Sequence, residues 1–168
     1  MIKLYQFDEL RPEEILNRDI RAEKNVEDVV DGILADVRAR GDAALKEYAL
    51  KFDGASIEEL QVTQAEIDEA FANMDPYFLE TLKEAAANIE AFHRQQVHKN
   101  FVVNDKPGIV LGQKYTPIEK AGVYVPGGTA AYPSTVLMDV IPAKVAGVSE
   151  IVMTTPAGKD GKVNPVIL

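Results

Sequence analysis

Apolar side chains recur at spacings of three and four residues through most of the first hundred residues, which is the pattern of amphipathic helices. One such helix is expected to end at Gly41. A second helix is expected to be capped by Asp42 and to end at Gly54. The first of these helices is expected over residues 25–40. Its apolar face consists of Val26, Val29, Val30, Ile33, Leu34 and Val37.

Two further helices are predicted from the residues that open them. Thr63 and Glu66 have the spacing of a capping box, in which each side chain bonds to the backbone amide of the other residue. Asp75 followed by Pro76 is typical of a cap and a first-turn proline, and predicts a long helix that runs to about Gln96. We expect the acidic residues of these helices to form a solvated face.

After residue 100 the pattern changes to short runs of β-forming residues. Residues 101–103 and 108–118 are expected to be strands, joined by a hairpin turn at residues 105–108. Residues 123–125 and 151–154 are apolar runs on either side of an amphipathic helix that begins near Ser134 and closes at Gly147, with a kink at Pro142. This strand, helix and strand have the length of a parallel βαβ unit. The second strand is expected to be buried on both faces, because its apolar run is continuous.

Composition divides the chain at about the same point. Residues 1–100 hold 22 acidic and 12 basic side chains, whereas residues 101–168 hold 5 and 6. Eight of the 11 glycines and seven of the 9 prolines follow residue 100. We therefore predict an acidic, mainly helical portion over residues 1–100 and an α/β portion over residues 101–168.

Several classes of function are disfavoured by composition. A net charge of −9 argues against binding to nucleic acid, which needs a basic surface. The sequence has no apolar run long enough to cross a membrane and no signal-peptide pattern at its start. With no cysteine, disulfides, thiol catalysis and zinc–thiolate sites are excluded, and a cytoplasmic location is expected.

The candidate site is the loop over residues 126–133, with Tyr124 at its edge. Loops at the carboxyl ends of parallel strands are the usual ligand sites of open α/β sheets. Gly127 and Gly128 can let the backbone approach a ligand closely, although they can equally serve a turn that needs positive φ. Likewise, Tyr124 can be an ordinary strand aromatic, and Ser134 can be the N-cap of the following helix.

The same loop lacks groups for acid–base chemistry. It contains no histidine, glutamate or aspartate, so it can hold a cofactor more readily than it can move a proton. It also departs from the Gly-x-Gly-x-x-Gly fingerprint. His93 and His98 are the chain's two histidines, and their spacing of five does not place them on one helix face, so we expect structural roles rather than metal ligation.

The run over residues 122–147 closely resembles histidinol dehydrogenases, and the similarity extends over all 168 residues. It includes the Gly-Asp-Ala-Ala-Leu turn at residues 41–45 and the Phe-Asp-Gly step at residues 52–54. The resemblance implies an α/β fold in which the amino-terminal helical portion precedes an incomplete Rossmann-like parallel-sheet domain. It also implies that the chain is the amino-terminal fragment of a longer protein, truncated within that domain.

The resemblance further implies an activity and its site. Members oxidise L-histidinol to L-histidine through the aldehyde, with two NAD molecules and zinc, as homodimers in the last steps of histidine biosynthesis. Tyr124, Pro126 and Gly127 fall on the cofactor-binding motif, and Ser134 lies near the substrate pocket. The family's zinc ligands and catalytic Glu-His pair are expected beyond Leu168, so no catalytic or metal residue is assigned here and the fragment alone should be inactive.

Two other functions remain open on the sequence alone. The chain can be a non-catalytic nucleotide- or anion-binding module that regulates a partner. It can also be a structural piece whose helices pack against a second subunit.

Overall fold

The structure, a computed structural model, describes residues 20–127 and 131–168, with side chains from residue 26 onward. The chain divides into two compact units, residues 1–45 and residues 46–168, and the division falls inside a helix. The boundary that composition predicts near residue 100 stays a prediction. None of the described helices combines the length and the apolar character needed to cross a bilayer.

The first unit is described as helix α2, Ile20–Arg40, followed by the start of α3, Asp42–Tyr48. Asp36 accepts two hydrogen bonds of 2.6 Å from the guanidinium of Arg40 in the last turn of α2. Gly41 has a φ of +57° and ends the helix, as predicted. The predicted apolar face of α2 is largely exposed, with Val26, Val29, Val30 and Leu34 all open to solvent.

The second unit begins with the rest of α3 and the π-helical turn η1, Ala49–Asp53, which ends at Gly54 with a φ of +68°. Its other elements are two helices, a hairpin, a strand, a helix and a strand. In chain order they are α4 (Gln64–Asn73), α5 (Pro76–Arg94), β1 (Phe101–Lys106), β2 (Ile109–Gln113), β3 (Lys120–Tyr124), α6 (Pro133–Ala146) and β4 (Glu150–Thr154).

The starts of α4 and α5 follow the predicted capping chemistry. The Thr63 hydroxyl accepts from the Glu66 amide, and the Glu66 carboxylate accepts from the Thr63 amide at 2.8 Å, which completes the capping box. The Asp75 carboxylate accepts from the Phe78 amide at 2.8 Å, with Pro76 at the first helical position. These contacts satisfy amides that a helix start otherwise leaves without partners.

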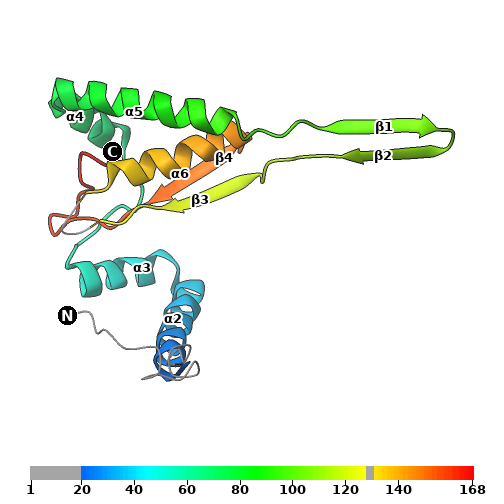
Figure 1. The fold of residues 1–168 in the computed structure, drawn as a ribbon. Coiled ribbons are helices and arrows are strands. Elements are labelled where there is room, and N and C mark those ends of the chain that lie inside the picture. The colour runs from blue at the N-terminus through cyan, green and yellow to red at the C-terminus, as the bar shows by residue number, and fades with distance from the viewer. Residues whose placement is uncertain (1–19, 128–130) are drawn as a thin grey trace, which may run out of the picture. The chain divides into compact units, whose positions relative to one another are not determined.

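The predicted βαβ unit is present. β3 and β4 pair in parallel, with Tyr124 opposite Thr154, and α6 is the crossover between them. α6 packs against β3 on one side and against α5 on the other, so the layers run from sheet to α6 to α5 (Figure 1). α6 continues through Pro142 as a single element.

The expectation that β4 is buried on both faces is wrong. Exposure alternates along both strands: Ile151 and Met153 are half-buried, whereas Val152 is 59% exposed. The physical reason is that α6 covers one face of this two-stranded sheet. The other face is open in the described part of the chain.

β1 and β2 form the predicted antiparallel hairpin, which turns at Gly108 with a φ of +75°. All residues of both strands are exposed, and the hairpin extends away from the helices of its unit (Figure 1). The Asn100 side chain closes its base by accepting from the Tyr115 amide at 2.6 Å.

Candidate cofactor site

The carboxyl ends of β3 and β4 lie side by side, as the parallel register requires. The amide of Val125 donates to the carbonyl of Thr154 at 2.9 Å, which extends the pairing one residue beyond β3. Val125 is fully buried, while the preceding Tyr124 is 59% exposed. Tyr124 is therefore at the rim of the sheet with its ring accessible, rather than inside a packed core.

The two loops that leave these strand ends meet at Gly127. A Cβ added there would lie 3.2 Å from Pro156 Cδ, 3.3 Å from the Pro156 carbonyl oxygen and 3.4 Å from Thr155 Oγ1. Gly127 is not among the glycines with positive φ, so the interpretation that it serves a left-handed turn is wrong for this residue. Close approach of the two loops is what favours glycine here. Gly128 lies outside the described residues.

A cavity of about 240 Å³ opens between these loops and the last residues of the chain. Its polar lining comes from Thr155, Asp160, Lys162 and Asn164. Gly127 is the predicted site residue that lines it; the described lining does not include Tyr124, Pro126 or Ser134. The site predicted from sequence is thus spread along a rim, with a cavity of mixed polar and apolar lining at Gly127.

The helix after the rim begins differently from the prediction. Pro133 is the first residue of α6 and Tyr132 is its N-cap, with no side-chain cap hydrogen bond. Ser134 is an exposed residue of the first turn, so the interpretation of Ser134 as N-cap is wrong. The reason is that Pro133 already has the fixed φ that suits a first helical position.

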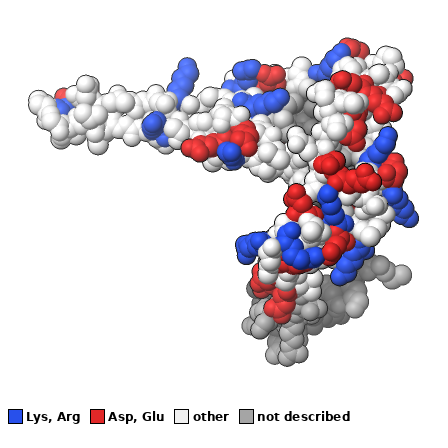
Figure 2. Space-filling view, turned by 180° about the vertical axis from the view of Figure 1, so that it is seen from behind, with Lys and Arg blue, Asp and Glu red and all other residues white. Residues whose placement is uncertain are grey.

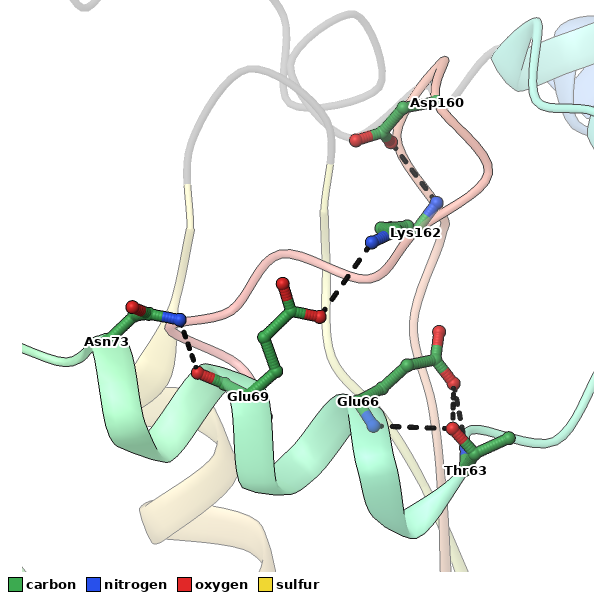
Figure 3. A network of polar contacts seen from close by, with 6 residues as sticks. All are labelled: Thr63, Glu66, Glu69, Asn73, Asp160 and Lys162. Atoms are coloured by element: carbon green, nitrogen blue, oxygen red, sulfur yellow. Dashed lines mark hydrogen bonds and ion pairs between the residues drawn. The ribbon is translucent and has the colours of Figure 1, made fainter.

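A short polar network holds the loop after β4 (Figure 3). Lys162 Nζ lies 3.9 Å from Glu69 Oε2 on α4, and the Lys162 amide donates to Asp160 Oδ1 at 3.1 Å. At the start of α4, the Thr63 amide and then its hydroxyl donate to the Glu66 carboxylate, and these bonds lower the pKa of Glu66. Sequence analysis missed Lys162, since a single lysine in a glycine-containing loop carries no spacing signal.

The described residues of the rim do not by themselves offer a zinc site. Among the described residues, no three His, Cys, Asp or Glu side chains gather closely enough to hold a metal ion. In the described lining of the rim cavity, Asp160 is the single carboxylate, and zinc sites are built from three or four imidazole, thiolate or carboxylate ligands. The groups present suit contacts to a cofactor through a ring face, hydroxyls and backbone.

Known proteins resemble the chain along its whole length. The family model described as histidinol dehydrogenase matches residues 16–168. The histidinol dehydrogenase of Chlorobaculum tepidum is 50% identical over 170 aligned residues, covering 100% of this chain and 40% of that protein. The one from Methanosarcina barkeri is 47% identical, covering 99% of this chain and 38% of that protein.

A solved structure agrees in fold. The crystal structure of histidinol dehydrogenase from Elizabethkingia anophelis superposes with a TM-score of 0.80 at 35% sequence identity, over 84% of this chain and 33% of that one. The chain thus spans about 40% of the length of the relatives named here. Since the family model covers nearly every residue and relatives of about half-identical sequence align end to end, the chain belongs to the histidinol dehydrogenase family.

Proposed function

We propose that the chain is the amino-terminal part of an NAD- and zinc-dependent enzyme that oxidises L-histidinol to L-histidine through the aldehyde. The observation that carries this proposal is the family match over residues 16–168, together with an accessible Tyr124 at the rim of a parallel βαβ unit. The same match disfavours a separate regulatory module. A cytoplasmic homodimer is the expected setting.

In this proposal the chain contributes one wall of the cofactor site. Tyr124 offers a ring face, Pro126 shapes the loop, and Gly127 keeps the two strand-end loops close enough to form a rim. NAD would accept the hydride when bound, and the exposed hydroxyl of Ser134 would face the substrate side. α6 adds the positive end of its dipole near the rim, which favours an anionic group there.

The remaining chemistry is assigned to residues beyond this chain. Alcohol oxidation needs a proton acceptor, and the predicted rim residues, a phenol, a hydroxyl and backbone, are poor bases at neutral pH. Zinc, held by ligands outside residues 1–168, would polarise the substrate oxygen. No proton transfer is assigned to the residues described here.

A chimera tests the proposal directly. Residues 1–168 replace the aligned part of the Chlorobaculum tepidum relative, which is 50% identical over the whole chain. We expect the chimera to reduce NAD with L-histidinol in the presence of zinc. A chimera that folds and binds zinc but has no such activity would contradict the proposal.

The role of Tyr124 is tested in the same chimera. Tyr124→Ala removes the ring face and is expected to raise the KM for NAD about tenfold with little change in kcat, the size of one aromatic contact. Tyr77→Ala is the matched control, because Tyr77 is 83% exposed on α5 and is not part of the rim. Equal KM values for the two variants would remove Tyr124 from the cofactor site.

A further inference from the structure

A second cavity lies at the opposite end of the β3–β4 sheet from the rim. It has a volume of about 480 Å³ and is formed by the end of α5, the base of the hairpin and the end of α6. Thr116 and Pro117 in its lining precede β3, and Ala146 precedes β4. Because the strands are parallel, this cavity is at their amino ends, whereas the candidate cofactor site is at their carboxyl ends.

The lining of this cavity has the character of a small-molecule site. It includes no Asp, Glu, Lys or Arg among the described residues, and its apolar part includes Val97, Pro142 and Val145. His98 stacks on Tyr115, with ring centroids 4.6 Å apart and an angle of 14° between the planes. Apolar cavities of this size with a few convergent polar groups are the usual form of ligand sites.

The fold brings His93 and His98 to one cavity, although their spacing in the sequence does not place them on one helix face. His93 Nδ1 lies 2.6 Å from Gln96 Oε1, which fixes the orientation of its ring. Two imidazoles, a phenol and an amide therefore converge on one apolar space, with a ring pair already stacked as a platform for a further ring.

The three segments that form this cavity are basic, in a chain whose net charge is −9. The segments that form it, residues 93–99, 114–117 and 142–146, contain four basic residues and no acidic ones. Arg94 is paired with Glu90. Lys99, Lys114 and Lys144 have no carboxylate partner within the described part of the chain. Basic and acidic side chains are both visible where the hairpin joins its unit (Figure 2).

Helix ends account for only part of this charge. Lys144 lies in the last turn of α6, where a cation favours the helix dipole whether or not a ligand is present. Lys99 and Lys114 lie outside the helices, next to His98 and Tyr115. An apolar cavity flanked by unpaired lysines is suited to a ligand with a flat apolar body and a negative group.

We infer that the cavity at the base of the hairpin binds a small aromatic anion, a flat ring that carries a carboxylate or a phosphate. The ring would stack on the His98–Tyr115 pair, and the anionic group would lie toward Lys99, Lys114 and Lys144. This site is separate from the candidate cofactor rim and does not depend on the proposed function.

Titration of the 168-residue chain with three indoles of different charge tests the inference. The probes are indole-3-acetate, the neutral alcohol tryptophol and the cationic amine tryptamine, followed by amide NMR signals. We expect indole-3-acetate to bind most tightly and tryptamine most weakly, with shifts centred on Val97, Thr116 and Val145. Added salt should weaken the binding of indole-3-acetate more than that of tryptophol.

Variants of single lysines distinguish binding at this cavity from nonspecific electrostatic attraction. Lys114→Gln and Lys144→Gln should each weaken indole-3-acetate about two- to fivefold, the range of an exposed charge contact, and leave tryptophol unchanged. Lys159→Gln in the loop after β4 is the control and should change neither. Tyr115→Ala should weaken all three probes, with Tyr77→Ala as its control. The lysine variants keep the test valid if Tyr115→Ala unfolds the hairpin base.

Three outcomes would overturn the inference. They are no saturable shifts with any of the probes, shifts centred away from the cavity, and equal affinity for the anion and the cation. Equal effects of Lys159→Gln and Lys144→Gln would likewise show that net charge, and not this site, governs the binding.

Discussion

Gly127 packs against Pro156 so closely that a Cβ at position 127 would lie 3.2 Å from the Pro156 Cδ atom. This contact joins the loop after β3 to the loop after β4, and thereby fixes the rim on which the candidate cofactor residues lie. Backbone contributes to the crowding as well, since the Pro156 carbonyl oxygen would be 3.3 Å away. A rigid neighbour cannot move aside as a flexible side chain can.

Gly127→Ala is therefore expected to push the two loops apart and to destabilise the second unit by about 1–2 kcal/mol, as overpacking does. Gly122→Ala is the control, because a Cβ at that position in β3 meets nothing within 4 Å. Urea unfolding measures both. A Gly127→Ala chain as stable as the Gly122→Ala chain would show that the loops separate without cost.

The capping box at α4 gives a pH-dependent prediction. The hydrogen bonds from the Thr63 amide and hydroxyl lower the pKa of Glu66. A carboxylate with a lowered folded-state pKa adds stability that is present above the unfolded value of about 4.3 and is lost as the pH falls through the lowered pKa. We therefore expect the first turn of α4 to become less stable as the pH falls from the ordinary glutamate value through the lowered pKa of Glu66. The exchange of the amides of residues 64–67 with solvent measures this loss.

Thr63→Ala removes the hydroxyl that accepts from the Glu66 amide, and should destabilise α4 by about 1 kcal/mol. It should also raise the pKa of Glu66 part of the way to its ordinary value, since the Thr63 backbone amide still donates. Thr81→Ala is a matched control, because its hydroxyl bonds to the Tyr77 carbonyl inside α5 and caps nothing. An unchanged Glu66 titration in Thr63→Ala would contradict the assigned cause.

A glycine that ends one helix and a glycine inside another are expected to respond to alanine with opposite signs. Gly147 ends α6 with a φ of +91°, which disfavours a side chain, so Gly147→Ala should destabilise by about 1 kcal/mol. Gly32 lies inside α2 with open space around it, so Gly32→Ala should stabilise that helix by about 1 kcal/mol. Chemical unfolding, followed separately by the amide signals of α2 and of α6, measures both changes in stability. Changes of the same sign in the two variants would contradict the prediction.

The parts of the fold that sequence predicts are those set by neighbouring residues. The Thr63–Glu66 box, the Asp75–Pro76 start and the hairpin turn at Gly108 each depend on chemistry within four residues, and all three are present. The parallel pairing of β3 with β4 was predictable too. A strand, a helix and a strand of this length rarely connect in another way.

What sequence could not predict depends on contacts between distant segments. Whether a strand is covered on one face or two is decided by which helices pack on it, so the apolar run of β4 could not reveal that Val152 is exposed. Similarly, His98 meets Tyr115 only because the hairpin returns to the end of α5. In the candidate site, loop position alone suggested Gly127, which lines the rim cavity, whereas Lys162 lines it from a loop with no motif.

The β1–β2 hairpin is expected to have low local stability. A two-stranded ribbon is marginal in water on its own, and every residue of β1 and β2 is exposed. In contrast, β3 and β4 have one face covered. We expect the hairpin amides to exchange with solvent at least about tenfold faster than those of β3 and β4 in this chain, because opening the hairpin exposes little further apolar surface.

Asn100 should control the base of this hairpin. Its side-chain oxygen accepts from the Tyr115 amide at 2.6 Å, so Asn100→Ala is expected to speed exchange at Tyr115 and to loosen the ring stacking between Tyr115 and His98. Asn104→Ala is the matched control, since Asn104 is exposed in β1 away from that base. If both variants change the exchange rate of the Tyr115 amide equally, the hairpin opens as one unit and the Asn100 hydrogen bond does not stabilise its base.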